Sequence, residues 1–397
     1  MPAHPLTAAH RHRILSVLSR LAGGPVQLTS EHHVGHEWAP VTRLVLDRDI
    51  PGIGSTILAK ARRVDGEGHG GPAFLRREVA ALRTAAPSGV TAHSMHVDDD
   101  AGIMLQTDLG EWPTLQDRLL DDDPAAAARG VVEMATAVGR LHASTVDRRA
   151  DHQRNLAAFA ADVETGLNYA HGMERWDEIE QACAELGLPS GRQARDEVVS
   201  LLRRAASPGP SAALTHLDLN PTNVLLTDAG ARLVDFEGSR FGHLGIDASF
   251  LDYPFPHHSR PWGILPDGVV RSADAAYRSA LADGGAHQVL AGYDQMLADG
   301  AAIVLLGRLG RMRLIARPDQ TPHDSWRRRG QTVQQIQTFT QLAERADDLA
   351  AFSAWLGALT DAMIARWPDA THPPAPLFPA FAHDGTGHEA ALGFPWA

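Results

Sequence analysis

Hydrophobic positions in the first 107 residues follow two helical patterns and several short strand-like runs. Over residues 7–22, apolar side chains recur at helical spacing before a Gly-Gly-Pro sequence, and residues 73–86 repeat this spacing before Pro87. Between and after these helices, short apolar runs are separated by turns that contain glycine or proline. The predicted strands are residues 25–29, 41–48, 55–63, 93–97 and 102–107.

From residue 108 onward the pattern is mainly helical, with one apolar hairpin embedded in it. The hairpin consists of predicted strands 223–227 and 232–236, joined by a turn that contains Gly230. We therefore expect an α+β fold in two lobes, a small β-rich lobe of residues 1–107 and a large helical lobe of residues 108–397. A cleft between lobes is a common place for a small-molecule site. The predicted helices of the second lobe are residues 113–120 and 124–145, with further segments within 153–205 and 272–367.

The hairpin region carries more polar side chains than a buried pair of strands needs. They are His216, Asp218, Asn220, Asn223, Asp235 and Glu237. A tight hairpin brings Asn223 and Asp235 to the same end, where one ion can reach both. Mg²⁺ takes one or two carboxylates in proteins and completes its octahedron with water and phosphate oxygens, so this pair predicts a magnesium site. Asp218, held nearby by the preceding loop, is placed to accept a proton or to orient a nucleophile.

The same polar residues have a simpler interpretation as turn formers. Asp218, Asn220 and Asn223 surround Pro221, and Asp and Asn side chains commonly cap turns of this kind. Taken one at a time, each residue fits that interpretation better. The combined pattern favours a reaction site.

Composition narrows the class of protein. The 36 basic and 48 acidic residues give a formal net charge of −12, which argues against a nucleic-acid partner and mildly favours a cationic small ligand. A single cysteine, Cys183, excludes an internal disulfide and fits a cytoplasmic protein. The N-terminus lacks the uninterrupted apolar core of a signal peptide, and no apolar run is long enough to span a bilayer, so no membrane partner is expected. The pattern indicates no oligomeric state.

Lysine occurs once in the chain, at Lys60 on predicted strand 55–63, and every other basic residue except histidine is arginine. A lone lysine on a strand is usually a solvated surface group. That interpretation is weak here, because this chain uses arginine at its surface positions.

Two motifs resemble the catalytic segment of the eukaryotic-type kinase fold. The pattern H-x-D-x-x-x-x-N runs from His216 to Asn223, and D-F-x follows the hairpin at Asp235. The local sequence is similar to that of the aminoglycoside phosphotransferase family of the protein-kinase-like fold, in which the two motifs are typically H-G-D-L-x-P-x-N and D-F-E. The resemblance implies a small-molecule kinase that uses ATP and Mg²⁺ and transfers the γ-phosphoryl group to an alcohol group.

The resemblance also implies individual roles. Asp218 would orient and deprotonate the acceptor hydroxyl, and Asn223 and Asp235 would hold Mg²⁺. Lys60, positioned by Glu78 on predicted helix 73–86, would contact the α- and β-phosphates, where a planar guanidinium would need a different geometry.

Four further residues follow from the same resemblance. The stretch GIMLQTDLG resembles the hinge between the lobes, where backbone groups of Gln106, Thr107 and Asp108 would bind adenine. Asp247 matches the aspartate that braces the catalytic loop, and it also fits a helix N-cap.

The chain departs from the family pattern at three places. The loop of residues 33–40 has only Gly35 in place of G-x-G-x-x-G, so it lacks the glycines with which the family pattern cradles phosphate. Leu217 stands where the family commonly has glycine. Glu237 replaces the glycine of D-F-G and is either an accessory metal ligand or only a neighbour.

The acceptor is expected to be a small molecule. Protein kinases place a long activation segment and an A-P-E motif after D-F-G, whereas here Asp247 follows Asp235 closely and no A-P-E follows. Family resemblance suggests an aminoglycoside or another sugar-bearing or amino-alcohol compound. Residues 251–268, rich in aromatics and histidine, suit a partly aromatic or anionic acceptor instead. Acidic residues near the hairpin, Asp247 and Asp252, suit a cation. The acidic residues of the predicted helices within 156–190 suit a cation or, more simply, form a solvated face; they are Asp162, Glu164, Glu174, Asp177 and Glu178.

Three alternatives stay open at this level. One is a metabolic kinase of the choline or homoserine type, and another is a pseudokinase that binds nucleotide without turnover. The third is a metal-dependent hydrolase with His216, Asp218 and Asp235 as ligands, which leaves Lys60 and Glu78 unexplained.

Overall fold

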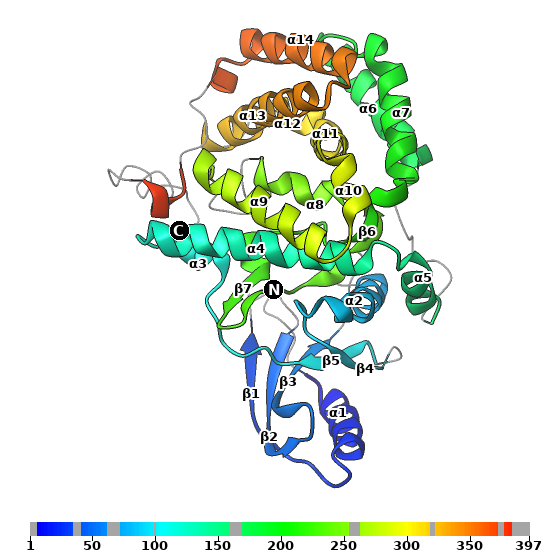
Figure 1. Ribbon diagram of the computed structural model, residues 1–397, viewed down its shortest axis with the longest axis vertical. Coiled ribbons are helices and arrows are strands. Elements are labelled where there is room, and N and C mark those ends of the chain that lie inside the picture. Colours follow the sequence, from blue (N-terminus) through cyan, green and yellow to red (C-terminus); the bar gives the residue numbers. More distant parts are fainter. Residues whose placement is uncertain are drawn as a thin grey trace.

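The chain divides visibly into a β-rich N-terminal part and a larger helical part (Figure 1). The computed structural model describes residues 6–34, 41–61, 72–98, 101–158, 169–253, 263–317, 322–371 and 377–382. The predicted two-lobed α+β fold is confirmed. Strand β5 ends at Thr107, and the assignment of residues 1–107 and 108–397 to separate domains stays a prediction.

The N-terminal part contains one five-stranded antiparallel sheet in the order β1-β2-β3-β5-β4. Because β3 has neighbours on both sides, a residue near its end is surrounded by sheet. Lys60 lies there, opposite Val41 of β2 and Met104 of β5. The strands are β1 (Leu28–Val34), β2 (Val41–Ile50), β3 (Gly54–Ala61), β4 (Ser94–Asp98) and β5 (Ile103–Thr107).

Helix α1 (Ala8–Leu21) packs on this sheet. It begins where the Thr7 side chain accepts a hydrogen bond from the His10 amide at 3.1 Å, a helix cap of the kind that sequence patterns favour. On its apolar face, Ile14, Val17 and Leu18 are buried against sheet residues such as Ile57 and Leu105. The sheet and α1 therefore form a core of their own.

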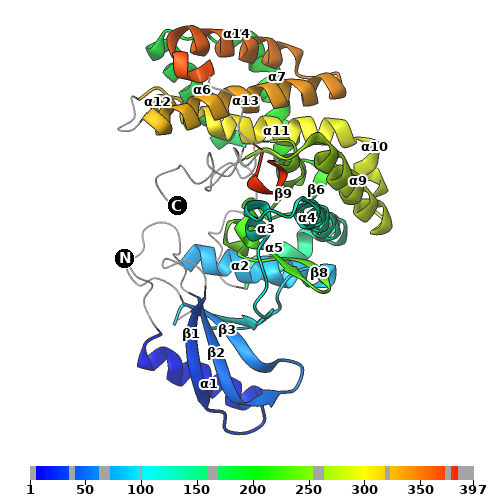
Figure 2. The same ribbon diagram turned by 90° about the vertical axis from the view of Figure 1, so that its left-hand side faces the viewer.

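Helix α2 (Pro72–Ala85) lies between the sheet and the helical part (Figure 2). Its buried Val79 and Leu82 pack into the core of the helical part, together with Met104 of β5. Residues of the sheet and of the helical part thus meet in one core, and α2 is the helix that joins them.

The helical part is built on α4 and α9, which cross in close contact. Gly139 of α4 makes this possible, because a Cβ atom there would lie 2.7 Å from the Cβ of Ala280 on α9. A second core, formed around Trp176, Phe352 and Trp355, holds the outer helices together. The helices are α3 (Leu115–Leu120), α4 (Pro124–Thr145), α5 (Arg149–Ala157), α6 (Tyr169–Leu186), α7 (Arg195–Ala206), α8 (Gly245–Ala248), α9 (Asp267–Asp283), α10 (His287–Ala291), α11 (Tyr293–Leu309), α12 (Met312–Ile315), α13 (Pro322–Ala346) and α14 (Ala350–Arg366).

Two short strand pairs lie within the helical part. The predicted hairpin is present as β7 (Val224–Thr227) and β8 (Gly230–Leu233). Its second strand was predicted to reach residue 236 but ends at Leu233, because Asp235 adopts a left-handed conformation with φ of 67° that no strand accommodates. The second pair, β6 (Ala212–Thr215) with β9 (Arg240–His243), was not predicted. Within the described ranges, no helix has the length and apolar content needed to cross a bilayer.

A buried ion pair fixes the connection between the sheet and the helical part. Arg43 of β2 donates from Nε to Asp108 Oδ2 at 2.6 Å, from Nη2 to Asp108 Oδ1 at 3.1 Å and from Nη2 to the Gly110 carbonyl at 3.1 Å. The Asp108 side chain is only 2% exposed. The hydrogen bonds from Arg43 outweigh the effect of burial and lower the pKa of Asp108, so that the carboxylate stays ionised.

Arg43→Met is expected to destabilise the protein by about 3 kcal/mol, because it leaves the Asp108 carboxylate buried without its counterion. Urea denaturation measures the effect. The control is Arg11→Met, which removes a similar pair with Glu31 at a position where the arginine is 39% exposed, and which is expected to cost less than about 1 kcal/mol. Equal losses for the two variants would contradict the role given to Arg43.

Candidate active site

Lys60 lies at the point where the two lobes meet. It leaves β3 nearly buried, and its Nζ lies 2.6 Å from Glu78 Oε2 of α2. The same nitrogen lies 2.7 Å from Asp235 Oδ1 and 3.4 Å from Glu237 Oε2, both in the segment after β8. One ammonium therefore joins the sheet, α2 and the hairpin segment of the helical part.

The charges around Lys60 are unbalanced. Three carboxylates face one ammonium, and ligand oxygens of Glu78, Asp235 and Glu237 lie within 4.8 Å of one another. Burial disfavours the ammonium, but the three carboxylates outweigh burial and raise the pKa of Lys60 above its usual value. Burial raises the pKa of Glu78 to about 7 against the opposing effect of Lys60. The cluster thus holds excess negative charge that a further cation would neutralise.

Asp218 is held by the amides of two asparagines. Asn223 Nδ2 donates to Asp218 Oδ2 at 3.2 Å and to the Asp218 carbonyl at 2.9 Å, and Asn220 Nδ2 donates to Asp218 Oδ1. Burial, with smaller contributions from Asp235 and Glu237, raises the pKa of Asp218. The carboxyl group is therefore both oriented and more basic than an ordinary aspartate, as a proton acceptor needs to be.

The hairpin brings Asn223 and Asp235 to the same end, as the sequence predicts. The Val234 amide donates to the Asn223 carbonyl at 3.0 Å, immediately before Asp235. The Asn223 amide nitrogen faces Asp218, which turns its oxygen, the atom a metal ion uses, away from that carboxylate.

Leu217 and Asp235 both adopt left-handed backbone conformations, with φ of 65° and 67°. Such conformations are costly for residues with a Cβ atom and persist only where the surroundings impose them. Leu217 occupies the position where the family pattern commonly has glycine, and its φ explains that preference. The strain at both positions lies beside the candidate site.

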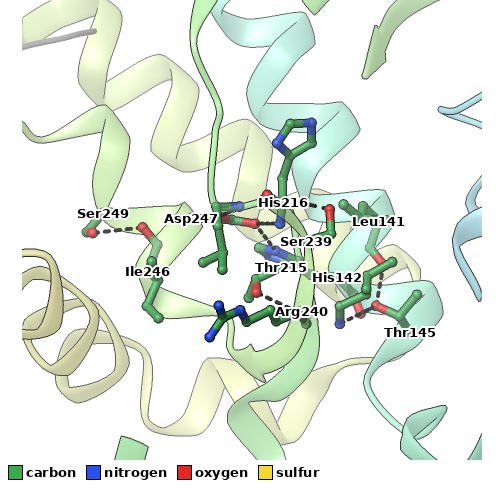
Figure 3. A network of polar contacts seen from close by, with 12 residues as sticks. Leu141, His142, Thr145, Thr215, His216, Ser239, Arg240, Ile246, Asp247 and Ser249 are labelled. Atoms are coloured by element: carbon green, nitrogen blue, oxygen red, sulfur yellow. Dashed lines mark hydrogen bonds and ion pairs between the residues drawn. The ribbon is translucent and has the colours of Figure 1, made fainter. Parts of the chain in front are cut away.

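Asp247 of α8 lies against His216, the residue before Leu217 (Figure 3), and constrains the backbone at both positions. Its carboxylate accepts hydrogen bonds from the amides of His216 at 2.6 Å and Leu217 at 2.9 Å. His142 Nε2 of α4 lies 3.2 Å from Asp247 Oδ2, and His142 Nδ1 lies 2.8 Å from the Tyr277 hydroxyl of α9. His142, His216, Asp247 and Tyr277 are all buried, so the loop that contains His216 and Asp218 is anchored to the α4–α9 core.

His142 and Tyr277 were not singled out in the sequence. The available signal was weak: a histidine and a tyrosine on the apolar faces of two helices, which are more often core residues than members of a site. Tyr277 contacts His142, and His142 contacts Asp247, which holds the loop.

His216 is engaged at both ring nitrogens. Nε2 lies 2.9 Å from the Val234 carbonyl, and Nδ1 accepts from the Asp218 amide at 3.3 Å. Its ring packs against Phe236 at 4.5 Å between centres. The side chain therefore fixes the shape of the loop and has no nitrogen directed at a metal ion.

The three predicted hinge residues make different contacts in the structure. Gln106 lies within β5, paired with Leu58 and Ser94, and the Thr107 amide donates to the His93 carbonyl at 3.0 Å. The Asp108 carboxylate points to Arg43. The Thr107 amide is thus used by the sheet, and adenine recognition by the backbone of this segment stays a prediction.

Several residues expected to bind phosphate or the acceptor either lie outside the described residues or contact other groups of the protein. Gly35 and most of the loop of residues 33–40 lie outside the described residues, as do residues 254–262 of the aromatic segment 251–268 and the acidic residues Asp162 and Glu164. Asp247 was expected to suit a cationic acceptor, but its carboxylate is buried and used by the loop amides. Asp177 pairs with Arg195 at 2.9 Å and Glu178 lies near Arg175, on exposed helix faces, which agrees with a solvated role for these charges.

Asp247→Asn is expected to destabilise the protein by about 3 kcal/mol, because one amide oxygen cannot replace two carboxylate oxygens that accept from His216 and Leu217. Urea denaturation tests this, with the exposed Asp283→Asn as control, for which a change within about 0.5 kcal/mol is expected. An Asp247→Asn variant as stable as the control would show that the brace is dispensable.

Comparison with known proteins agrees with this arrangement. The model of the phosphotransferase enzyme family (APH) matches residues 67–298, more than half of the chain. No curated protein matches the chain.

Three solved structures are similar at low identity. A choline kinase from Cryptosporidium parvum Iowa II is 13% identical, with 87% of this chain and 99% of that chain covered and a TM-score of 0.47. An ADP-bound aminoglycoside phosphotransferase is 10% identical, with coverage of 88% and 99% and a TM-score of 0.47. A macrolide 2′-phosphotransferase from Brachybacterium faecium is 17% identical, with coverage of 87% and 97% and a TM-score of 0.39. Values this low support no inference about the ligands of this chain.

The family match spans α2 with Glu78, the loop that contains His216 and Asp218, the hairpin and Asp247. It confirms the resemblance found in the sequence and the predicted class of enzyme, a small-molecule kinase with an alcohol group as acceptor. The chain therefore belongs to the phosphotransferase enzyme family.

Proposed function

We propose that the protein transfers the γ-phosphoryl group of ATP to a hydroxyl group of a small molecule. The observation that carries the proposal is the contact of Lys60 with Glu78 and Asp235, which joins residues of both lobes in one cluster beside Asp218. A kinase needs such a cluster because its catalysis consists mainly of positioning and charge stabilisation.

In this proposal Lys60 contacts the α- and β-phosphates, and Glu78 holds its side chain in place. The ammonium is already drawn toward the helical part by Asp235, so a bound triphosphate would lie between the two lobes. Backbone groups around Gln106, Thr107 and Asp108 are the proposed contacts for adenine. A lysine suits the phosphate position because its compact ammonium can reach oxygens of two phosphates while it pairs with a carboxylate.

The residues of the cluster fit a magnesium ion. Carboxylate oxygens are the ligands this ion prefers, and the cluster holds three carboxylates against one ammonium. Asp235 and Asn223 would hold the ion, with Glu237 as a further ligand. When bound, Mg²⁺ neutralises negative charge that develops on the phosphate oxygens.

Asp218 would act on the acceptor. Its carboxylate, fixed by Asn220 and Asn223, would accept a hydrogen bond from the acceptor hydroxyl and orient the oxygen toward the γ-phosphorus. A bond forms between that oxygen and phosphorus, the bond from phosphorus to the β–γ bridging oxygen breaks, and ADP leaves. The hydroxyl proton passes to Asp218 and then to solvent.

The acceptor is proposed to be an aminoglycoside or another sugar-bearing or amino-alcohol compound, on the basis of family resemblance. A metabolic acceptor of the choline or homoserine type has equal support from the residues. The hydrolase alternative loses support, because both ring nitrogens of His216 are used within the loop.

Asp218→Ala is expected to lower acceptor-dependent ADP release by about 1,000-fold, since it removes the proton acceptor. The assay mixes purified protein, ATP and Mg²⁺ with a panel of aminoglycosides, nucleoside antibiotics, amino alcohols and sugars. Asp228→Ala, at the exposed turn of the same hairpin, is the matched control and should retain activity. Acceptor-dependent ADP release that survives Asp218→Ala would refute the mechanism.

A further inference from the structure

Helix α5 of the helical part lies along α2, the helix that carries Glu78 (Figure 1). Part of the contact between them is polar. Thr84, near the end of α2, meets His152 and Asn155 of α5, and both Thr84 and His152 are buried. None of these three residues belongs to the cluster around Lys60.

The hydrogen bonds at Thr84 define which atom donates. The Thr84 hydroxyl lies 2.7 Å from the Ala80 carbonyl one turn earlier and donates its single proton there. Its oxygen then accepts from Asn155 Nδ2 at 3.1 Å and from His152 Nδ1 at 3.1 Å. His152 must therefore carry its proton on Nδ1, and the hydroxyl has no further hydrogen-bonding capacity.

His152 also contacts the strand that follows the Asp235 segment. Its ring centre lies 5.9 Å from that of Phe241 in β9, and the Arg149 guanidinium lies 5.0 Å from the same Phe241 ring. Strand β9 pairs with β6, which leads directly into His216. One side chain thus touches α2 and the strand pair that flanks the catalytic loop.

The environment keeps His152 neutral. Burial, with a smaller effect of Arg149, lowers the pKa of His152 to about 4. A neutral ring with one N–H group is the form that the contact with Thr84 requires, and it persists at neutral pH.

Glu78 needs to be held from outside its own cluster. The neighbouring Asp235 and Glu237 carry the same charge and disfavour the ionised Glu78 carboxylate. Lys60 attracts it, but Lys60 is shared with both of those carboxylates. A contact elsewhere on α2 that fixes the helix against the helical part would keep Glu78 within reach of Lys60.

We propose that Thr84, His152 and Asn155 are positioning residues that fix α2 against the helical part and thereby hold Glu78 on Lys60. Thr84 lies six residues after Glu78, about 9 Å along the same helix, so a shift at one position moves the other. The inference rests on the proposed kinase function, in which the Lys60–Glu78 pair positions the phosphates. It assigns these residues no contact with substrate.

Thr84→Val keeps the shape of the side chain and leaves the buried N–H of His152 and the partly buried N–H of Asn155 without this acceptor. We expect it to lower kcat about tenfold, because misplacement of phosphate-positioning groups costs rate, with KM for the acceptor unchanged. Thr84→Ser retains the hydroxyl and should restore kcat. Thr340→Val in α13, which removes a similar hydroxyl contact to Ile336 at 3.0 Å far from α2, should leave kcat unchanged.

The histidine gives a second matched pair. Asn places an amide N–H where His152 has Nδ1, whereas Gln places it where the ring has Nε2. His152→Asn should therefore retain more activity than His152→Gln. If Thr84→Val does not fold, this pair decides the question alone, and equal activity of the two variants would overturn the proposal.

A double-mutant cycle separates positioning from simple stability. In a Glu78→Gln background the Lys60 contact is already weakened, so Thr84→Val should lower kcat by clearly less than the tenfold expected in the wild type. A buried residue with a purely structural role would cause the same fold-loss in both backgrounds. That additive result would overturn the proposal.

Hydrogen exchange gives a readout that needs no acceptor. In the wild-type protein, α2 amides around Glu78 should exchange slowly, and Thr84→Val should accelerate them at least tenfold while α13 amides stay unchanged. Acceleration without any acceptor-dependent ADP release in the wild type would support the α2 contact and count against the proposed function. Unchanged α2 exchange would refute the positioning role even in an active kinase.

Discussion

The ammonium of Lys60 is the charge on which the arrangement of this protein depends. It is nearly buried and faces three carboxylates, one from α2 and two from the segment after the hairpin. A buried charge persists only where it is paired, and a cluster of like charges persists only where the fold imposes it. The contact of Lys60 with these carboxylates joins the sheet, α2 and the segment after the hairpin. The candidate site forms where these three elements meet.

The rest of the fold supplies the rigidity that such a cluster needs. Asp247 draws the amides of His216 and Leu217 into place and connects them through His142 to the α4–α9 core. The left-handed backbone at Leu217 and Asp235 is the local cost of that arrangement. Arg43 and Asp108 fix the connection between the lobes from the other side.

Much of this architecture could be predicted from the sequence, for identifiable reasons. Helices such as α4 have strong apolar periodicity and few alternatives, and Lys60 stood out because the chain contains no other lysine. Residues whose role depends on a partner far away in the sequence could not be predicted. Arg43 gains its role from its contact with Asp108, and His142 from its contact with Asp247. Strands β6 and β9 were missed because each is short and pairs only across the intervening hairpin. Asp247 was expected both to brace the loop and to suit a cationic acceptor, and its buried carboxylate accepts hydrogen bonds from the amides of His216 and Leu217.

Isothermal titration calorimetry can compare the binding of ATP with Mg²⁺ to wild-type protein and to Lys60→Arg. This measurement tests whether the ammonium of Lys60 holds the nucleotide. A guanidinium preserves the positive charge but cannot occupy the position of the ammonium between Glu78 and Asp235. Lys60→Arg is expected to bind the nucleotide at least about tenfold more weakly, while Arg48→Lys at an exposed position of β2 binds it normally. Equal affinity of Lys60→Arg and wild type would contradict the account.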